Sequence, residues 1–141
     1  MEVVIARSLG LDIGDKRIGV ALCDSGGILA TPFAIIDRRD ERQDIETIID
    51  IINQYQVKRI VVGLPRSMNG SIGKQAEKVQ GFVQSLCSHI EVPVEFRDER
   101  LTTVSAKRLM QAAHTKKTRI KSRDDAVAAA IILQGYLDET Q

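Results

Sequence analysis

The sequence predicts one α/β domain, a five-stranded mixed sheet with helices on both faces. Two strand-like stretches near the N-terminus alternate large apolar with small or polar residues and are joined by a tight turn. After a third strand, stretches with a helical apolar period alternate with short apolar strands. The length of 141 residues suits a single core and is short for two, so residues 1–141 are expected to form one domain.

Composition narrows the classes of function. A net charge of +1 provides no bulk attraction to nucleic acid, so a basic surface would have to be local. Cys23 and Cys87 are too few for a disulfide framework or a thiolate metal site, and we expect both to be buried apolar residues in a reducing cytosol. No apolar run has the length of a signal core or a membrane span, which predicts a cytoplasmic protein without a membrane partner.

The first hairpin, residues 8–23, turns at Gly14–Lys16. Pairing Ile13 with Ile18 places the large apolar side chains on one face, because strand side chains alternate. Asp12 then lies on the other face among small residues, namely Gly10, Gly19 and Ala21. A ligand could approach its carboxylate closely there. The alternative is that Asp12 is simply solvated on an exposed sheet face.

The elements after the hairpin complete the sheet and its helices. They are predicted over Ile28–Ile36 (strand), Asp44–Gln54 (helix), Arg59–Gly63 (strand), a helix from about Ser71, Val92–Arg97 (strand), Leu101–Ala113 (helix) and about Asp124–Leu137 (helix). Pro32 indicates an edge strand or a bulge. Ser71 is the expected N-cap of its helix. That helix should pack through Ile72, Ala76, Val79, Phe82, Val83 and Leu86, and the last one through Val127, Ala130, Ile131 and Leu137.

Three acids are candidates for a shared site. Asp12 is late in the first strand, Glu99 follows the fifth, and Asp125 is in the expected first turn of the last helix. Sites of open α/β sheets form beyond the carboxyl ends of parallel strands, so Asp12 and Glu99 converge if their strands are parallel and close. Two alternatives stay open: Asp98 competes with Glu99, and Asp124 and Asp125 could serve only the helix dipole.

Clustered carboxylates imply a cation. Two unit charges about 4 Å apart repel by about 4 kcal/mol at an effective dielectric constant of about 20. Oxygen ligands select Mg²⁺ or Mn²⁺ over zinc, and such ions support phosphodiester hydrolysis. The sequence contains no Walker loop and no cluster of His and Cys, and His89 and His114 are isolated.

Four segments together resemble the YqgF/RuvX family. They are Leu-Gly-Leu-Asp-Ile-Gly-Asp-Lys-Arg-Ile-Gly-Val-Ala around Asp12, Val-Val-Gly-Leu-Pro-Arg-Ser-Met-Asn-Gly-Ser from Val61, Asp-Glu-Arg-Leu-Thr-Thr from Asp98, and Asp125 followed by an apolar helix. The resemblance implies an RNase H-like fold and nuclease activity on Holliday junctions or on the 5′ end of precursor 16S ribosomal RNA. By position it implies catalytic and metal-binding roles for Asp12, Glu99 and Asp125. Asn69 departs from the family pattern, where Asp is common.

Basic residues near these acids are candidates for contacts with nucleic acid. A stretch from His114 to Arg123 contains five cations and no acid just before Asp125. The predicted set is Lys16, Arg17, Arg66, Lys74, Arg100, Lys116, Lys117, Arg119 and Lys121. Lys74 could assist a phosphate at a helix N-terminus, or the helix could simply be capped there. The basic stretch could also be an ordinary solvated loop.

These observations favour a metal-dependent endonuclease acting on structured nucleic acid, most of all on precursor 16S rRNA. A Holliday junction resolvase is the alternative substrate assignment, and a two-stranded cut would need a homodimer rather than a monomer. An actin-like or sugar-kinase ATPase would need two such domains, and 141 residues cannot supply both. A non-catalytic RNA-binding or transcription-associated module has no evident use for three acids. Ribosomal precursor particles are a further expected partner.

Overall fold

The computed structural model describes residues 7–24, 26–66, 72–99 and 121–140, with the backbone alone for residues 121–125. Five strands form one sheet in the order β3-β2-β1-β4-β5. They are β1 (Arg7–Ile13), β2 (Arg17–Cys23), β3 (Ala30–Asp37), β4 (Val57–Leu64) and β5 (Val94–Asp98). The β1, β2 and β3 strands form antiparallel pairs, whereas β4 pairs in parallel with β1 and β5. The predicted five-stranded mixed sheet is confirmed.

The first hairpin has the predicted register. Ile13 pairs with Ile18 and Asp12 lies opposite Gly19. The amide of Gly14 donates to the carbonyl of Arg17 at 2.9 Å, which closes the turn. A Cβ atom on Gly14 would lie 2.8 Å from that same oxygen, so the turn leaves no room for another residue type.

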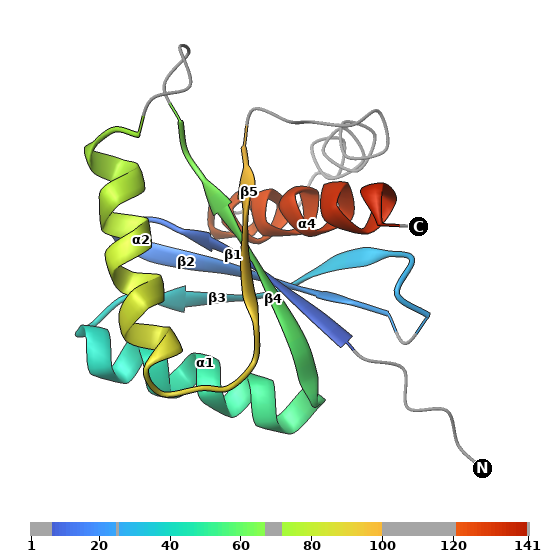
Figure 1. Cartoon of the computed structure of the whole chain (residues 1–141), viewed down its shortest axis with the longest axis horizontal. Coiled ribbons are helices and arrows are strands. Elements are labelled where there is room, and N and C mark those ends of the chain that lie inside the picture. The colour runs from blue at the N-terminus through green and yellow to red at the C-terminus, as the bar shows by residue number, and fades with distance from the viewer. Residues whose placement is uncertain (1–6, 25, 67–71, 100–120, 141) are drawn as a thin grey trace.

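Helices cover both faces of the sheet, as predicted (Figure 1). Helices α1 (Glu41–Tyr55) and α2 (Lys74–Cys87) lie on one face and α4 (Lys121–Glu139) crosses the other. The first face buries the large alternate residues of the hairpin together with Ile45, Ile48, Ile52, Val79, Phe82, Val83 and Leu86. The α4 face is built from smaller residues, including Ala21, Cys23, Val61, Ala129, Ala130, Ile132 and Leu133.

Helix α4 covers most of the hairpin face on which Asp12 lies among small residues. A Cβ atom on Gly10 would lie 2.8 Å from the Ala129 carbonyl oxygen and 2.8 Å from the Leu133 Cβ atom. The small residues of β1 and β2 therefore let a helix approach the sheet closely, where the sequence pattern had indicated space for a ligand. Asp12 itself stays half-exposed at the end of β1.

Helix α1 starts before the predicted Asp44. It begins at Glu41, because the side chain of Asp40 accepts a hydrogen bond from the Gln43 amide and caps the first turn.

The predicted N-cap of α2 at Ser71 is wrong. The N-cap is Gly73, whose carbonyl accepts the first helical bond from Glu77 at 3.0 Å. Ile72 therefore precedes the helix and is exposed, outside the predicted apolar stripe, while the remainder of that stripe is buried.

Helix α4 begins at Lys121 rather than Asp124, and Ile131 is only half-buried. Ala129 and Leu133 are fully buried and make the close approach to the sheet.

Smaller expectations have mixed outcomes. Pro32 lies on the edge strand β3, where the register with β2 shifts between Val20 and Ala21, so both interpretations of this proline are confirmed. Cys23 is buried, but the expectation for Cys87 is wrong, because it is the last residue of α2 and is exposed.

The predicted helix Leu101–Ala113 lies outside the described residues. None of the helices within the described ranges is long and apolar enough to cross a membrane.

Candidate nuclease site

Two of the three predicted acids meet at one end of the sheet. Asp12 is the penultimate residue of β1, and Glu99 directly follows β5. The Glu99 amide donates to the Leu64 carbonyl at 3.2 Å, which extends the β4–β5 ladder by one residue and places Glu99 beside the end of β4. A side-chain hydrogen bond then joins Glu99 to Asp12. The predicted convergence therefore occurs across one intervening strand.

The surroundings of the Glu99 carboxyl group perturb it strongly. The pKa of Glu99 is raised from its usual 4.5 to about 7, first because burial removes water from the carboxyl group. The negative charge of Asp12, the hydrogen bond that protonated Glu99 donates to the Asp12 carboxylate and the charge of Asp98 add to the same effect. Although Glu99 as a residue is exposed, its carboxyl end is turned toward Gly63 and away from open water. Near neutral pH this pair attracts either a proton or a cation.

Asp98 is not interchangeable with Glu99. It pairs in register with Leu64, whose side chain belongs to the core beneath α1 and α2. The neighbouring Arg97 is buried on the opposite face, where its guanidinium group lies against Gly135 of α4. Strand alternation thus directs Asp98 away from the face that Glu99 and Asp12 share. The carboxylate of Asp98 lies 4.0 Å from the guanidinium of Arg66.

Asp125 is placed by its backbone only. It is the fifth residue of α4, one turn before Ala129, whose carbonyl passes over Gly10 of β1. The described part of α4 starts at Lys121, so Asp125 lies beyond the first helical turn. The effect of the helix dipole is strongest within that first turn. The dipole explanation is therefore weaker for Asp125 than the sequence suggested, but it still applies to Asp124, the fourth residue of the helix.

Some of the predicted nucleic-acid contacts lie in the described structure. Lys16 is exposed in the turn after β1, and Arg17 opens β2 beside it. Arg66 is exposed just after β4, and Lys74 is the exposed first residue of α2. Arg100, Lys116, Lys117 and Arg119 lie outside the described residues, as does Asn69. The side chain of Lys121 is also not described.

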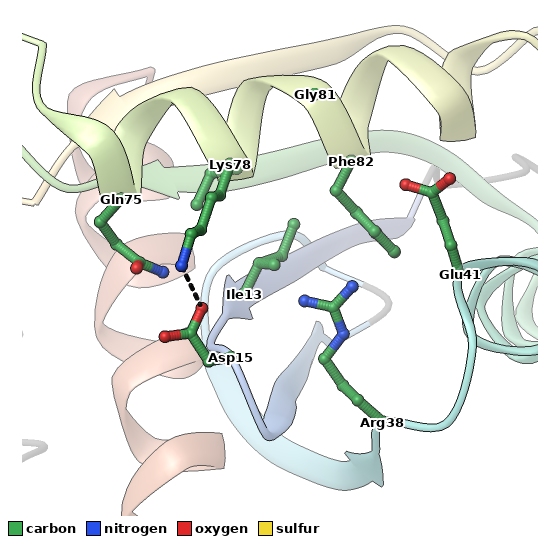
Figure 2. Close-up of a pocket in the computed structure, with 9 residues that line it drawn as sticks. Ile13, Asp15, Arg38, Glu41, Gln75, Lys78, Gly81 and Phe82 are labelled. Carbon is green, nitrogen blue, oxygen red and sulfur yellow. Dashed lines mark ion pairs between the residues drawn. The ribbon is translucent and has the colours of Figure 1, made fainter.

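A pocket of about 380 Å³ lies between the β1–β2 turn and α2 (Figure 2). Ile13 lines it, and Asp12, the preceding residue of β1, faces the other side of the sheet. Ile13, Val79 and Phe82 are its apolar lining. At its rim, the ammonium group of Lys78 lies 3.6 Å from the Asp15 carboxylate. Its charged side chains are of both signs, so it does not form a uniform surface for phosphates.

Arg38 links this pocket to the site. Its Nε donates to the buried carboxylate of Asp44 at 3.1 Å, and its Nη1 donates to the carbonyl of Gly14 at 3.0 Å. The guanidinium also lies over the ring of Phe82, 4.9 Å from the centroid. Arg38 thereby fixes the turn two residues after Asp12. Sequence reasoning missed this residue, because it lies between the predicted strand Ile28–Ile36 and the predicted helix Asp44–Gln54, where no element was expected.

The donor set fits a hard divalent cation. Asp12 and Glu99 offer carboxylate oxygens, and the raised pKa of Glu99 beside the Asp12 charge favours a positive charge there. Within the described part of the chain, no three His, Cys, Asp or Glu side chains gather closely enough to hold a metal. The position of Asp125 on α4 leaves it as the predicted third ligand.

Solved structures of Holliday junction resolvases have the same fold. The structure of T. thermophilus RuvC in complex with Holliday junction substrate matches with a TM-score of 0.65 at 11% identity, covering 96% of this chain and 97% of that one. The yeast mitochondrial Holliday junction resolvase Ydc2 matches with a TM-score of 0.59 at 11% identity, covering 94% of this chain and 78% of that one. At such identities the likeness shows the fold alone, and the RNase H-like fold is confirmed.

Sequence comparison then defines the family. The model of the family described as "RuvX: Holliday junction resolvase" matches residues 6–139, and the chain belongs to this family. A protein of Clostridium acetobutylicum named "Putative pre-16S rRNA nuclease" is 47% identical over 132 residues, covering 94% of this chain and 98% of the relative. A relative of the same name from Thermoanaerobacter pseudethanolicus is 46% identical over 133 residues, covering 94% and 96%.

Proposed function

We propose that this protein is a divalent-metal-dependent endonuclease that matures the 5′ end of precursor 16S rRNA in the cytoplasm. The observation that carries the proposal is the contact between Asp12 and Glu99, held together across the sheet although each carboxylate repels the other. Such a pair is favourable only when a cation or a proton relieves the repulsion between the two carboxylates. The names of the relatives support the substrate.

Asp12, Glu99 and Asp125 would hold Mg²⁺ or Mn²⁺ in this proposal. The bound ion would supply an activated water and stabilise charge on the phosphate oxygens. The chain's own part is to hold Asp12 on a rigid inner strand and Glu99 at the end of β5. Lys16, Arg17 and Lys74 would contact phosphates of the substrate from nearby elements.

Resolution of four-way DNA junctions is the second candidate, because the family is described by that activity. A junction needs two symmetric cuts and therefore two copies of the chain, whereas a single cut in rRNA can be made by a monomer. A non-catalytic RNA-binding module is a third possibility, which the Asp12–Glu99 pair disfavours, since clustered acids repel phosphates.

The proposal is tested by cleavage of both substrates side by side. Precursor 16S rRNA and a four-way DNA junction are incubated with the protein in Mg²⁺, in Mn²⁺ and with a chelator. We expect rRNA cleavage that requires metal and is absent in the D12N/E99Q/D125N variant. Preferential junction cleavage would replace the substrate assignment, and metal-dependent cleavage of neither substrate would reject the nuclease proposal.

The metal itself can be followed through stability. Because the clustered acids repel each other, Mg²⁺ or Mn²⁺ should raise the melting temperature of the protein, and D12N/E99Q/D125N should abolish that increase. The measurement is thermal unfolding over a titration of metal. An equal increase in the triple variant would place the metal elsewhere.

A further inference from the structure

We propose that Gly63 is a positioning residue of the site: the missing side chain at this point of β4 lets Glu99 reach Asp12. The inference rests on the proposed function for its biological meaning. The geometric part is independent of that function, because it concerns only how Asp12, Gly63 and Glu99 pack.

The strand order creates the need for such a residue. Asp12 is on β1 and Glu99 follows β5, and β4 lies between these two strands. Neighbouring strands are about 4.8 Å apart, so backbones two strands apart are separated by roughly 10 Å. A hydrogen bond nevertheless joins the two side chains. The side chain of Glu99 must therefore lean over β4.

Gly63 is the residue that it crosses. A Cβ atom on Gly63 would lie 2.7 Å from Oε1 of Glu99 and 3.0 Å from its Cγ. The same atom would lie 2.4 Å from Cδ1 of Ile132 on α4. Real Cβ atoms essentially never come within 3.0 Å of such atoms, so a methyl group at this position conflicts with both Glu99 and Ile132.

Space, not backbone conformation, is the reason for glycine here. Among the described glycines, Gly27 is the one with a left-handed φ, so the backbone of Gly63 would accept any residue. Glycine also weakens a strand interior, and in strands it often marks a close approach. The obstructing atoms are the ends of flexible side chains, which can swing aside. A side chain at position 63 should therefore disturb the site more than the fold.

The test removes the Ile132 conflict first. Ile132→Val deletes the Cδ1 atom, so in the I132V background the remaining conflict of Gly63→Ala is with Glu99. Gly81→Ala is a matched control, because a Cβ atom there would meet nothing within 4 Å. The metal-free crystal structures of I132V and G63A/I132V are then compared. We expect the double variant to fold, with the Glu99 carboxyl group turned away from Asp12.

Binding of Mn²⁺, followed by calorimetry, connects this geometry to the proposed function. Adding G63A to I132V should weaken Mn²⁺ binding by at least about 10-fold, a reduction typical of residues that orient metal ligands. In an E99A/I132V background the same change should have little effect, and G81A should leave Mn²⁺ binding unchanged.

Each result is decisive. The proposal is overturned if Glu99 still contacts Asp12 beneath the added methyl group, or if G63A/I132V does not fold, which would show that the fold itself requires glycine. An equal reduction of affinity in the E99A background would also overturn it. If Glu99 is displaced but I132V itself binds no Mn²⁺, Gly63 positions Glu99 as proposed and the metal-dependent function fails instead.

Discussion

Two single residues, Asp12 and Glu99, distinguish this candidate site from ordinary surface acids. Asp12 lies on an inner strand beside small residues, and Glu99 is brought to it from two strands away. Desolvation and the neighbouring charge raise the pKa of Glu99 to about 7. A charge pair of this kind is costly in the metal-free protein and useful only when a cation or a proton joins it.

Asp12→Asn should separate catalysis from folding. The amide keeps the size of the side chain but removes the charge that would hold the metal, so we expect the nuclease rate in saturating Mn²⁺ to fall by about 100-fold or more. The metal-free melting temperature should stay equal or rise, because one repelling charge is gone. Asp98→Asn, on the opposite face, should reduce activity much less. A D12N variant that cleaves at the normal rate would refute the mechanism.

The pH dependence of metal-free stability should reveal Glu99. Between pH 4.5 and about 7 the unfolded chain has released a proton that folded Glu99 retains. The folded state therefore binds more protons, and its stability falls as pH rises through this window. Melting temperatures in chelator from pH 5 to 8 should decline less steeply in E99Q. A wild-type curve that E99Q leaves unchanged would mean that the Glu99 pKa is not raised.

At the scale of elements, the site depends on how the hairpin is held against its neighbours. Arg38 follows β3 and connects the Gly14 carbonyl to the buried carboxylate of Asp44 in the first turn of α1. The backbone amide of Arg39 also donates to Asp44 at 3.1 Å. One buried acid thereby ties the end of β3, the start of α1 and the turn after Asp12 together.

Asp44→Ala should therefore destabilise the fold. It leaves the largely buried guanidinium of Arg38 without its carboxylate, and the free energy of unfolding is expected to fall by roughly 3 kcal/mol. Urea denaturation measures it. The matched control is Glu46→Ala on the same helix, where the pair with Arg42 is exposed (61% and 83% for the two side chains) and a decrease below about 1 kcal/mol is expected. Equal decreases would show that the Asp44 contacts are not important.

At the scale of the whole molecule, the sheet was predictable in detail and the site in part. The hairpin register followed from the two-residue period, and it placed Asp12 opposite Gly19 correctly. The choice of Glu99 over Asp98 agrees with strand alternation. What the sequence did not reveal were contacts between distant segments: α4 over the small residues of β1, and Glu99 over Gly63. Such contacts depend on where elements cross, which a local pattern does not encode.

Substrate binding is the remaining property of the whole molecule. Lys116, Lys117, Arg119 and Lys121 lie just before Asp125 in the sequence, and we predict that they bind phosphates. Changing all four to Ala should weaken binding and make the slope of log K against log salt shallower, by about 0.7–0.9 for each phosphate that is no longer neutralised. Binding to precursor rRNA over a salt series measures this slope. An unchanged slope would assign the phosphates to another surface.

The proline in the edge strand has a consequence for how copies of this molecule can meet. Pro32 has no N–H group, and the register shift beside it interrupts the regular ladder of β3. An added strand from another chain would find one donor missing and the edge distorted. The outer side of β3 is therefore a poor template for a sheet continued between copies, and also for aggregation of partly folded chains through this edge.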